Sequence, residues 1–355
     1  MYNKRLLPWF GQNTAEAIFL KKGPNVRWAS GFQGADSCVL MTPGGGFLLT
    51  DPRYTEQASI EAPDFTVVNW RETGGSVMKA VAHILRDQKL HSMAFESDTL
   101  SFGEYSALRE ETDAELVPTQ DVVEKLRSVK TSEEIECLRA ACEIACRAFH
   151  RILKDIRVGV TEKKLAAKLS SYMVFEGADT QPYGNILISG PNTSLLHGIP
   201  SGRALQYGDF VLMDYGCQFN GYMSDMTRTV VVGKASDRQR EVYELEKQML
   251  EDSLAVMRAG VKGGDIYAAS VRAIRNTPYF DYHYGGIGHG IGLFVHEHPF
   301  IRKDAPDVYA ENIVTTIEPG LYIPGWGGVR IEDQVLIKDG GYENLISIPH
   351  DLIEL

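Results

Sequence analysis

A thirteen-residue stretch from Gly285 to Glu297, with five glycines and two histidines, restricts the fold of this chain more than any other segment. Glycine at this density breaks helices, so an extended or irregular backbone is expected here. In a regular strand His289 and His296 would face opposite sides. Both reach one site only if the glycines let the backbone bend. Glycines beside a histidine also indicate that a ligand approaches the backbone closely.

Two aspartates flank a predicted hairpin ahead of this stretch. The apolar run 210–213 predicts a buried strand that ends at Asp214, and Asn220-Gly221 is a strong hairpin turn. The return strand begins at Asp225, so the hairpin is expected to bring the two aspartates together. Two carboxylates held close shift each other's pKa unless a cation neutralises them. Taken alone, the pair is explained equally well by two strand ends at the surface.

Two glutamates follow near the C-terminus. Pro319 favours an extended backbone at Glu318. Around Glu332, alternation along a strand puts Arg330, Glu332 and Gln334 on one face and apolar residues on the other. A polar face of this kind is typically exposed to solvent, so each glutamate taken singly is expected at the surface.

The 355 residues exceed the usual size of one hydrophobic core, which predicts two domains. Residues 1–125 alternate short strands and helices, with a hairpin turn at 43–46, and indicate a small mixed α/β domain. At Thr131-Ser132, followed by acidic residues, a helix N-terminus is predicted. A second domain is therefore expected at 126–355, giving an α/β (α+β) chain. Its helices are predicted at about 132–152, 161–177, 237–260 and 264–277.

Composition excludes several classes of protein. The formal net charge of −11 disfavours a nucleic-acid partner, because such binding needs basic residues on phosphates. No apolar run approaches the roughly 20 residues that cross a bilayer. The start of the chain lacks the pattern of a signal peptide. Five cysteines without CxxC pairs suit reduced thiols, so we expect a cytoplasmic protein without a membrane partner.

The acidic and imidazole residues together carry a family resemblance. Five of them, in this order and in these contexts, resemble the ligands of the pita-bread metallopeptidases: Asp214, Asp225, His289, Glu318 and Glu332. That family includes methionine aminopeptidase, aminopeptidase P and prolidase. The resemblance covers essentially the whole chain, because aminopeptidase P and prolidase also carry a preceding α/β domain. It implies a creatinase/prolidase-type N-terminal domain and a C-terminal pita-bread catalytic domain.

The resemblance implies a site for two divalent metal ions. Asp214 would bind one metal, Asp225 and Glu332 would bridge the two, and His289 with Glu318 would bind the second. Such a pair lowers the pKa of a bridging water and polarises the scissile carbonyl. An oxygen-rich set with one imidazole favours Mn²⁺, with Co²⁺ or Zn²⁺ as alternatives.

Three further roles come from the same resemblance. His197 and His296 would bind the substrate carbonyl and stabilise the tetrahedral intermediate, and Glu318 would carry the proton. Arg330 would orient a carboxylate or the substrate, unless it is a surface arginine.

The implied activity is hydrolysis of the bond after the first residue of a short peptide, preferentially Xaa-Pro, by a homodimer. The alternatives are a creatinase-like hydrolase of a small non-peptide substrate and a non-catalytic peptide-binding module. Both would differ at the metal ligands, all five of which are present. Many relatives carry a histidine four residues before the metal-binding one, where this chain has Gly285, so the proline-side pocket departs from the family pattern. Dipeptides and longer peptides stay equally open as substrates.

Overall fold

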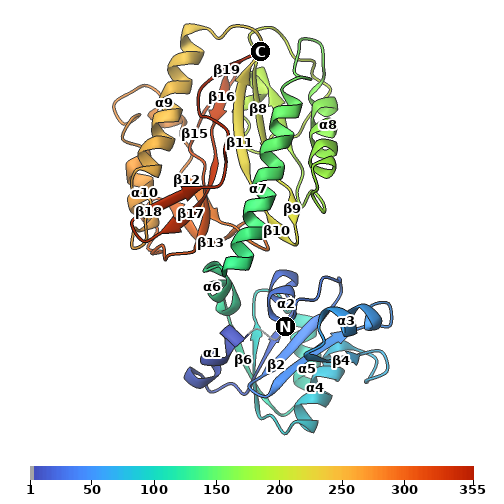
Figure 1. Ribbon diagram of the computed structural model, residues 1–355. Coiled ribbons are helices and arrows are strands. Elements are labelled where there is room, and N and C mark those ends of the chain that lie inside the picture. Colours follow the sequence, from blue (N-terminus) through green and yellow to red (C-terminus); the bar gives the residue numbers. More distant parts are fainter. Residues whose placement is uncertain (1–3) are drawn as a thin grey trace. The chain divides into compact units, whose positions relative to one another are not determined.

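The computed structural model describes residues 4–355, and the chain divides into two compact units after Arg127 (Figure 1). The domain boundary expected from the sequence, between residues 125 and 126, lies two residues before this division. Among the described residues, no helix has both the length and the apolar character that a bilayer span requires.

The N-terminal unit is built on a six-stranded mixed sheet in the order β4-β3-β2-β1-β5-β6. Its strands are β1 (Ala17–Leu20), β2 (Cys38–Thr42), β3 (Gly45–Thr50), β4 (Phe65–Asn69), β5 (Ser92–Glu96) and β6 (Glu115–Thr119). Its helices are η1 (Lys4–Leu6), α1 (Leu7–Gln12), α2 (Gly23–Ser30), α3 (Thr55–Glu61), α4 (Val77–Asp87), α5 (Phe102–Glu111) and α6 (Val122–Ser128). The last residue of α6, Ser128, is the first residue of the C-terminal unit. The predicted hairpin is confirmed, because β2 and β3 pair antiparallel.

The C-terminal unit contains a four-stranded sheet, β19-β11-β8-β7, and a five-stranded sheet, β13-β12-β14-β17-β18. Two short ribbons, β9–β10 and β15–β16, complete its strands. The strands are β7 (Ile186–Ser189), β8 (Phe210–Tyr215), β9 (Gln218–Phe219), β10 (Tyr222–Met223), β11 (Met226–Val231), β12 (Gly286–Gly290), β13 (Glu297–Arg302), β14 (Val314–Ile317), β15 (Gly320–Ile323), β16 (Gly327–Arg330), β17 (Asp333–Lys338), β18 (Gly341–Asn344) and β19 (Ile353–Glu354).

Two pairs of helices cover these strands from opposite sides (Figure 1). The helical segments are α7 (Ser132–Ile152), α8 (Glu162–Phe175), η2 (Gly190–Ser194), α9 (Asp237–Leu254), α10 (Gly263–Ser270) and η3 (Phe280–Tyr282). Strand β8 lies between two apolar cores, because Val211 and Met213 pack in the core that includes α7 and α8, whereas Phe210 packs in the core that includes α9. The strand is therefore held rigidly up to Asp214, its fifth residue.

Helix α7 begins where the sequence predicts. The Thr131 hydroxyl accepts a hydrogen bond from the Glu134 backbone N–H, and the Glu134 carboxylate accepts one from the Thr131 N–H. This capping box satisfies two backbone donors that a helix start leaves free. The helix then buries one apolar stripe that includes Leu138, Cys142 and Phe149.

Two of the predicted helices are shorter than expected. Helix α9 ends at Leu254, because the residues after it form turns that reach Gly260, whose φ of 86° is the left-handed conformation that glycine adopts readily. Helix α10 ends at Ser270, and the chain continues to Pro278 through turns such as Arg272 N–H to Ala269 C=O.

Candidate metal centre

The two aspartates come from neighbouring antiparallel strands. In the β8–β11 ladder Asp214 pairs with Thr227, and Asp225 precedes Thr227 by two residues, so all three side chains belong to one face. The Asn220-Gly221 turn closes the short β9–β10 ribbon instead of joining the two long strands directly. The aspartates are thus diagonal neighbours, and both line one cavity.

The glycine-rich segment bends as predicted. The register of β12 against β13 shifts on both sides of Gly288-His289, and the rings of His289 and His296 lie perpendicular with their centroids 4.5 Å apart. The reason inferred for the glycines is wrong at two positions. A Cβ on Gly288 would lie 2.3 Å from the Thr316 carbonyl oxygen, and one on Gly290 would lie 2.2 Å from the His298 carbonyl oxygen. Neighbouring backbone, and not a ligand, requires glycine there.

His289 is oriented as a metal ligand would be. Its Nδ1 lies 3.1 Å from the Gly290 carbonyl oxygen, which only accepts, so Nδ1 carries the proton. Its Nε2 lies 3.3 Å from Glu318 Oε1 and 3.7 Å from Asp225 Oδ2. Burial lowers the pKa of His289 to about 4, which keeps the ring neutral at physiological pH. A neutral imidazole with its second nitrogen fixed by a carbonyl is the form that binds metals.

Glu332 is buried, so the expectation of a solvent-exposed polar face is wrong. Only 1% of its surface is exposed, because its backbone N–H bonds to the Thr227 carbonyl oxygen and holds it against β11. The Thr227 hydroxyl donates to Glu332 Oε2 at 2.7 Å. Glu332 Oε1 is also buried and has no hydrogen-bond partner among the described residues. A buried carboxylate oxygen without a partner is costly unless a cation binds it.

Ligand atoms of Asp225, His289 and Glu332 lie within 4.8 Å of one another. Burial, with the charges of neighbouring carboxylates, raises the pKa of Asp225 and of Glu332 well above the usual range. Burial also raises the pKa of Glu318 to about 7. Carboxylates gathered in this way resist ionisation, and divalent cations remove that penalty. The donor set therefore fits the metal ions that the sequence implies.

Arg330 is 3% exposed, which excludes the surface arginine considered from the sequence. Its guanidinium pairs with the Asp214 carboxylate, donates to the Tyr322 hydroxyl at 2.7 Å, and donates from Nε to the Thr227 hydroxyl at 3.1 Å. Every nitrogen of the guanidinium thus has a partner, so Arg330 fixes the Asp214 carboxylate in place.

Sequence reasoning missed the two tyrosines of the centre. The Tyr183 hydroxyl donates to Asp225 Oδ1 at 2.7 Å, and Tyr322 accepts from Arg330. Tyr183 lies in an irregular segment before β7, where no periodicity indicates which way a side chain points. Thr227 was recognised in the sequence only as a neighbour of Asp225, and its hydrogen bonds to Glu332 and Arg330 were not predicted.

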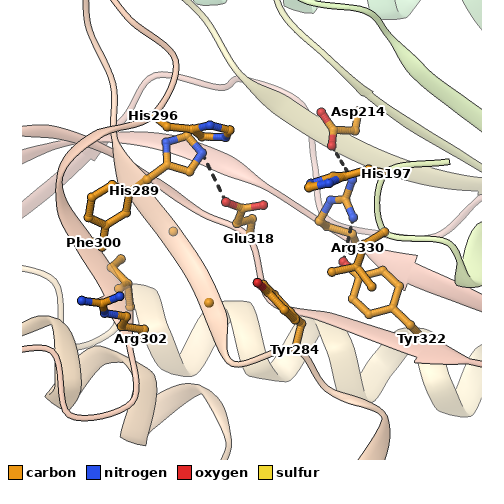
Figure 2. Close-up of a pocket in the computed structure, with 14 residues that line it drawn as sticks. His197, Asp214, Tyr284, His289, His296, Phe300, Arg302, Glu318, Tyr322 and Arg330 are labelled. Carbon is orange, nitrogen blue, oxygen red and sulfur yellow. Dashed lines mark hydrogen bonds and ion pairs between the residues drawn. The ribbon is translucent and has the colours of Figure 1, made fainter. Parts of the chain in front are cut away.

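A cavity of about 400 Å³ is lined by His197, Asp214, His289, His296, Glu318, Tyr322 and Arg330, among others (Figure 2). Figure 2 shows Glu318 between His289 and His296 on one side and His197 with Asp214 on the other. An adjoining cavity of about 430 Å³ shares these five residues and includes Asp225 in its wall. Glu332 lines neither cavity, but it has a ligand atom within 4.8 Å of those of Asp225 and His289. The structure thus brings all the predicted site residues to one place, while their individual roles stay predictions.

Comparisons with known proteins agree with this geometry. Residues 136–339 match metallopeptidase family M24, and residues 3–129 match the creatinase/prolidase N-terminal domain. The uncharacterized peptidase YqhT of Bacillus subtilis is 35% identical over 353 residues, which are 99% of each chain. The chain superposes on an Xaa-Pro dipeptidase from Bacillus anthracis with a TM-score of 0.95 (36% identity, 99% and 98% coverage). An X-Pro aminopeptidase from Thermotoga maritima gives a TM-score of 0.90 (32% identity, 98% and 99% coverage).

Proposed function

The chain belongs to metallopeptidase family M24, and we propose that it is a metal-dependent exopeptidase that hydrolyses Xaa-Pro bonds at the N-terminus of short peptides. The unpartnered, buried oxygen of Glu332 carries this proposal, because it lies in a cluster where Asp225 and His289 offer ligand atoms within 4.8 Å. Structural carboxylates are normally bonded at both oxygens when buried.

The proposed ligand roles are those that the resemblance to the family implies. Asp225 and Glu332 would hold both of two divalent cations, Asp214 would bind one of them, and His289 with Glu318 would bind the other. The spare oxygen of Glu332 and the fixed tautomer of His289 support this assignment. Two such cations supply a water of lowered pKa and an electrophile for the scissile carbonyl. We propose Mn²⁺ as the native metal, because four carboxylates and one imidazole form a hard donor set.

The chain's own residues position the peptide and move protons. His197 and His296 lie on opposite sides of Glu318 in Figure 2, where their rings can donate to a carbonyl oxygen and to the tetrahedral intermediate. Burial lowers the pKa of His296, so it donates as a neutral ring. Glu318 takes a proton from water and passes it to the leaving nitrogen. Arg330 holds Asp214 throughout.

We also propose a homodimer in the cytoplasm, with residues 1–125 as a separately folding N-terminal domain. Exposed apolar residues support dimerisation. Ile199 lines the second cavity and is 85% exposed, and the exposed Leu195 and Phe294 are sequence neighbours of the cavity residues Leu196 and Val295. The five cysteines are all free thiols, which suits a reducing compartment.

A single assay separates this function from its two alternatives. Protein purified without chelator is tested for metal content and for turnover of Xaa-Pro dipeptides, Xaa-Pro-Yaa peptides and proline-free controls, before and after chelation. We expect about two metals per chain and Xaa-Pro turnover that chelation abolishes. Metal-rich protein that leaves every Xaa-Pro peptide intact would favour a creatinase-like hydrolase. Protein that binds peptides without metal or turnover would favour a binding module.

A further inference from the structure

The loop that carries His197 is closed at its base by one buried carboxylate. This histidine loop, residues 189–201, begins at Ser189, the last residue of β7. Glu162, the first residue of α8, has no exposed surface. Its Oε1 accepts hydrogen bonds from the Ser189 backbone N–H and hydroxyl, both at 2.8 Å. Its Oε2 accepts from the Ser201 backbone N–H at 2.9 Å and hydroxyl at 2.7 Å. One side chain therefore joins the two ends of the loop.

The charge of Glu162 matches its surroundings. The Asn192 amide also donates to Oε1, at 3.2 Å, so five donors surround the carboxylate. Burial raises the pKa of Glu162, but the hydrogen bonds from Ser201, Ser189 and Asn192 outweigh burial and lower the pKa below its usual range. The group is therefore ionised and only accepts hydrogen bonds. Its place in the first turn of a helix favours the same negative charge.

A partly buried ion pair supports one end of the loop. The Arg203 guanidinium donates to the Ser189 hydroxyl at 2.7 Å and to the two carboxylate oxygens of Asp209 at 2.6 and 2.9 Å. Gly190 has a φ of 54°, and a Cβ there would lie 2.5 Å from Arg203 Nη2 and 2.6 Å from Asp209 Oδ1. The loop thus turns directly over charged groups. The side chain of Arg203 holds the Ser189 end, whereas the side chain of Glu162 reaches both ends.

The His197 ring depends on this loop for its position. It lines both cavities of the metal centre, but within residues 4–355 it forms no hydrogen bond or ion pair. The turn that carries it is closed by a hydrogen bond from the Gly198 N–H to the Leu195 carbonyl oxygen. Figure 2 shows the ring on the Asp214 side of Glu318. Because no partner holds the ring, the backbone of the loop determines where it lies.

We propose that Glu162 is a positioning residue, whose carboxylate holds the two ends of the histidine loop together and so keeps the His197 imidazole where the substrate carbonyl binds. Hydrogen bonds to an ionised group are stronger than those between neutral groups, so the loop has little freedom at its base. Glu162 lines neither cavity, and it acts on the reaction only through the loop. This inference rests on the proposed function, which gives His197 its task.

The test is a double-mutant cycle on hydrolysis of Leu-Pro by the metal-loaded enzyme. In Glu162→Gln the new NH2 group faces a backbone N–H in either orientation, so one end of the loop is released. We expect kcat/KM to fall about tenfold to a hundredfold, because a displacement of about 1 Å at a positioning group has an effect of this size. The fall should divide between kcat and KM as it does in His197→Ala, and metal content should be unchanged.

The second half of the cycle distinguishes positioning from a general loss of structure. In a His197→Ala background, Glu162→Gln should change kcat/KM less than about twofold. The control is Thr161→Ala, which removes the N-cap of the same helix and touches no atom of the loop. It should lower stability and keep the wild-type kcat/KM.

Two further measurements do not depend on Glu162→Gln folding well or on turnover. Ser201→Ala removes one hydroxyl donor and keeps the backbone bonds, so kcat/KM should fall only about twofold to fivefold, and only when His197 is present. Limited proteolysis examines the loop directly. Cleavage within residues 190–200 should be at least about tenfold faster in Glu162→Gln than in the wild type, and unchanged in Thr161→Ala.

The outcomes separate this inference from the function on which it rests. Additive falls in the double variant, wild-type kcat/KM in Glu162→Gln, or wild-type kcat/KM in His197→Ala would overturn the positioning role. Equal cleavage of the loop in the wild type and in Glu162→Gln would overturn it even for an enzyme that hydrolyses no Xaa-Pro peptide. A metal-loaded wild-type enzyme without turnover would overturn the proposed function itself.

Discussion

The two units of the chain bury carboxylates in different ways. In the N-terminal unit Glu96 accepts hydrogen bonds from the backbone of Lys21 and Lys22 and from the Asn25 amide, and Glu124 pairs with Lys22 at 2.6 Å. In the C-terminal unit one carboxylate oxygen of Glu332 accepts a hydrogen bond from the Thr227 hydroxyl, and the other has no hydrogen-bond partner among the described residues. The first arrangement gives both carboxylate oxygens hydrogen-bond donors, and the second has an oxygen that a cation would satisfy.

The pKa of a buried glutamate does not by itself distinguish a structural carboxylate from a metal ligand. Burial raises the pKa of Glu96 as it raises the pKa of Glu332. The partners distinguish the two. Glu96 accepts hydrogen bonds at both oxygens, and its one acidic neighbour, Glu124, is paired with Lys22. Glu332 has one oxygen without a hydrogen-bond partner among the described residues, and the charges of three further carboxylates raise its pKa. A buried acid surrounded by acids indicates a metal site, and one surrounded by donors indicates structure.

The largest effect is expected from the proposed bridging ligands. Asp225→Asn and Glu332→Gln each keep the shape of the side chain and remove one negative charge between the cations. Turnover of Xaa-Pro peptides should fall at least about a thousandfold, with a loss of bound metal. The measurement is kcat together with metal content on folded protein. Unchanged activity in either variant would refute its bridging role.

Arg228→Met should destabilise the C-terminal unit strongly. Arg228 is 2% exposed, pairs with buried Asp333 at 2.7 Å, and donates to the Glu332 and Ile348 carbonyl oxygens. Removing Arg228 leaves the buried Asp333 with His350 as its one remaining ionisable partner among the described residues, and breaking a buried pair in this way costs about 3–5 kcal/mol. Denaturant unfolding of the two proteins measures the loss. A change of less than about 1 kcal/mol would show that Asp333 is compensated in another way.

His296→Ala should reduce catalysis without removing the metals. His296 lies beside His289 and lines the cavity, and its proposed task is to donate to the carbonyl and the tetrahedral intermediate. Loss of such a donor lowers kcat by about 10²–10³-fold. Metal content should stay at the wild-type value. If the variant loses metal, His296 is a ligand and its role here is misassigned.

Glu96→Gln gives the smallest effect and sharpens the comparison between the units. One carboxylate oxygen accepts from the backbone N–H groups of Lys21 and Lys22 and the other accepts from the Asn25 amide, so the new NH2 group faces a donor in either orientation. This costs about 1–3 kcal/mol of stability. Metal content and kcat should be unchanged at a temperature where the protein is folded. A loss of metal in this variant would mean that the two kinds of buried acid are not separate in function.

Local patterns in the sequence predicted the hairpin, the bend and the helix starts, whereas the gathering of the five ligands was predicted from the resemblance to a known family. Glycine density predicts the bend that brings His289 to His296, and the apolar run before Asp214 predicts its strand. Burial of Arg330 and Glu332 could not be predicted, since alternation gives the face of a strand and not what covers it. Here Thr227 covers both side chains, because its hydroxyl bonds to each of them. Glu246 of α9 accepts a hydrogen bond from the backbone N–H of Ile331, which lies between Arg330 and Glu332.

The part played by Tyr183 was also beyond sequence reasoning, because its contact with Asp225 joins residues 42 positions apart through an irregular segment. The pairing of Arg330 with Asp214 is of the same kind, since it spans 116 positions between side chains. Such contacts depend on the register of strands from different sheets, which local periodicity does not determine.

The most direct test is an anomalous-diffraction map of crystals grown with Mn²⁺. We predict two peaks about 3.5–4 Å apart, with carboxylate oxygens of Asp225 and Glu332 between them and His289 Nε2 on one. A map without peaks at this cluster, or with Mn²⁺ bound only elsewhere on the chain, would contradict the account.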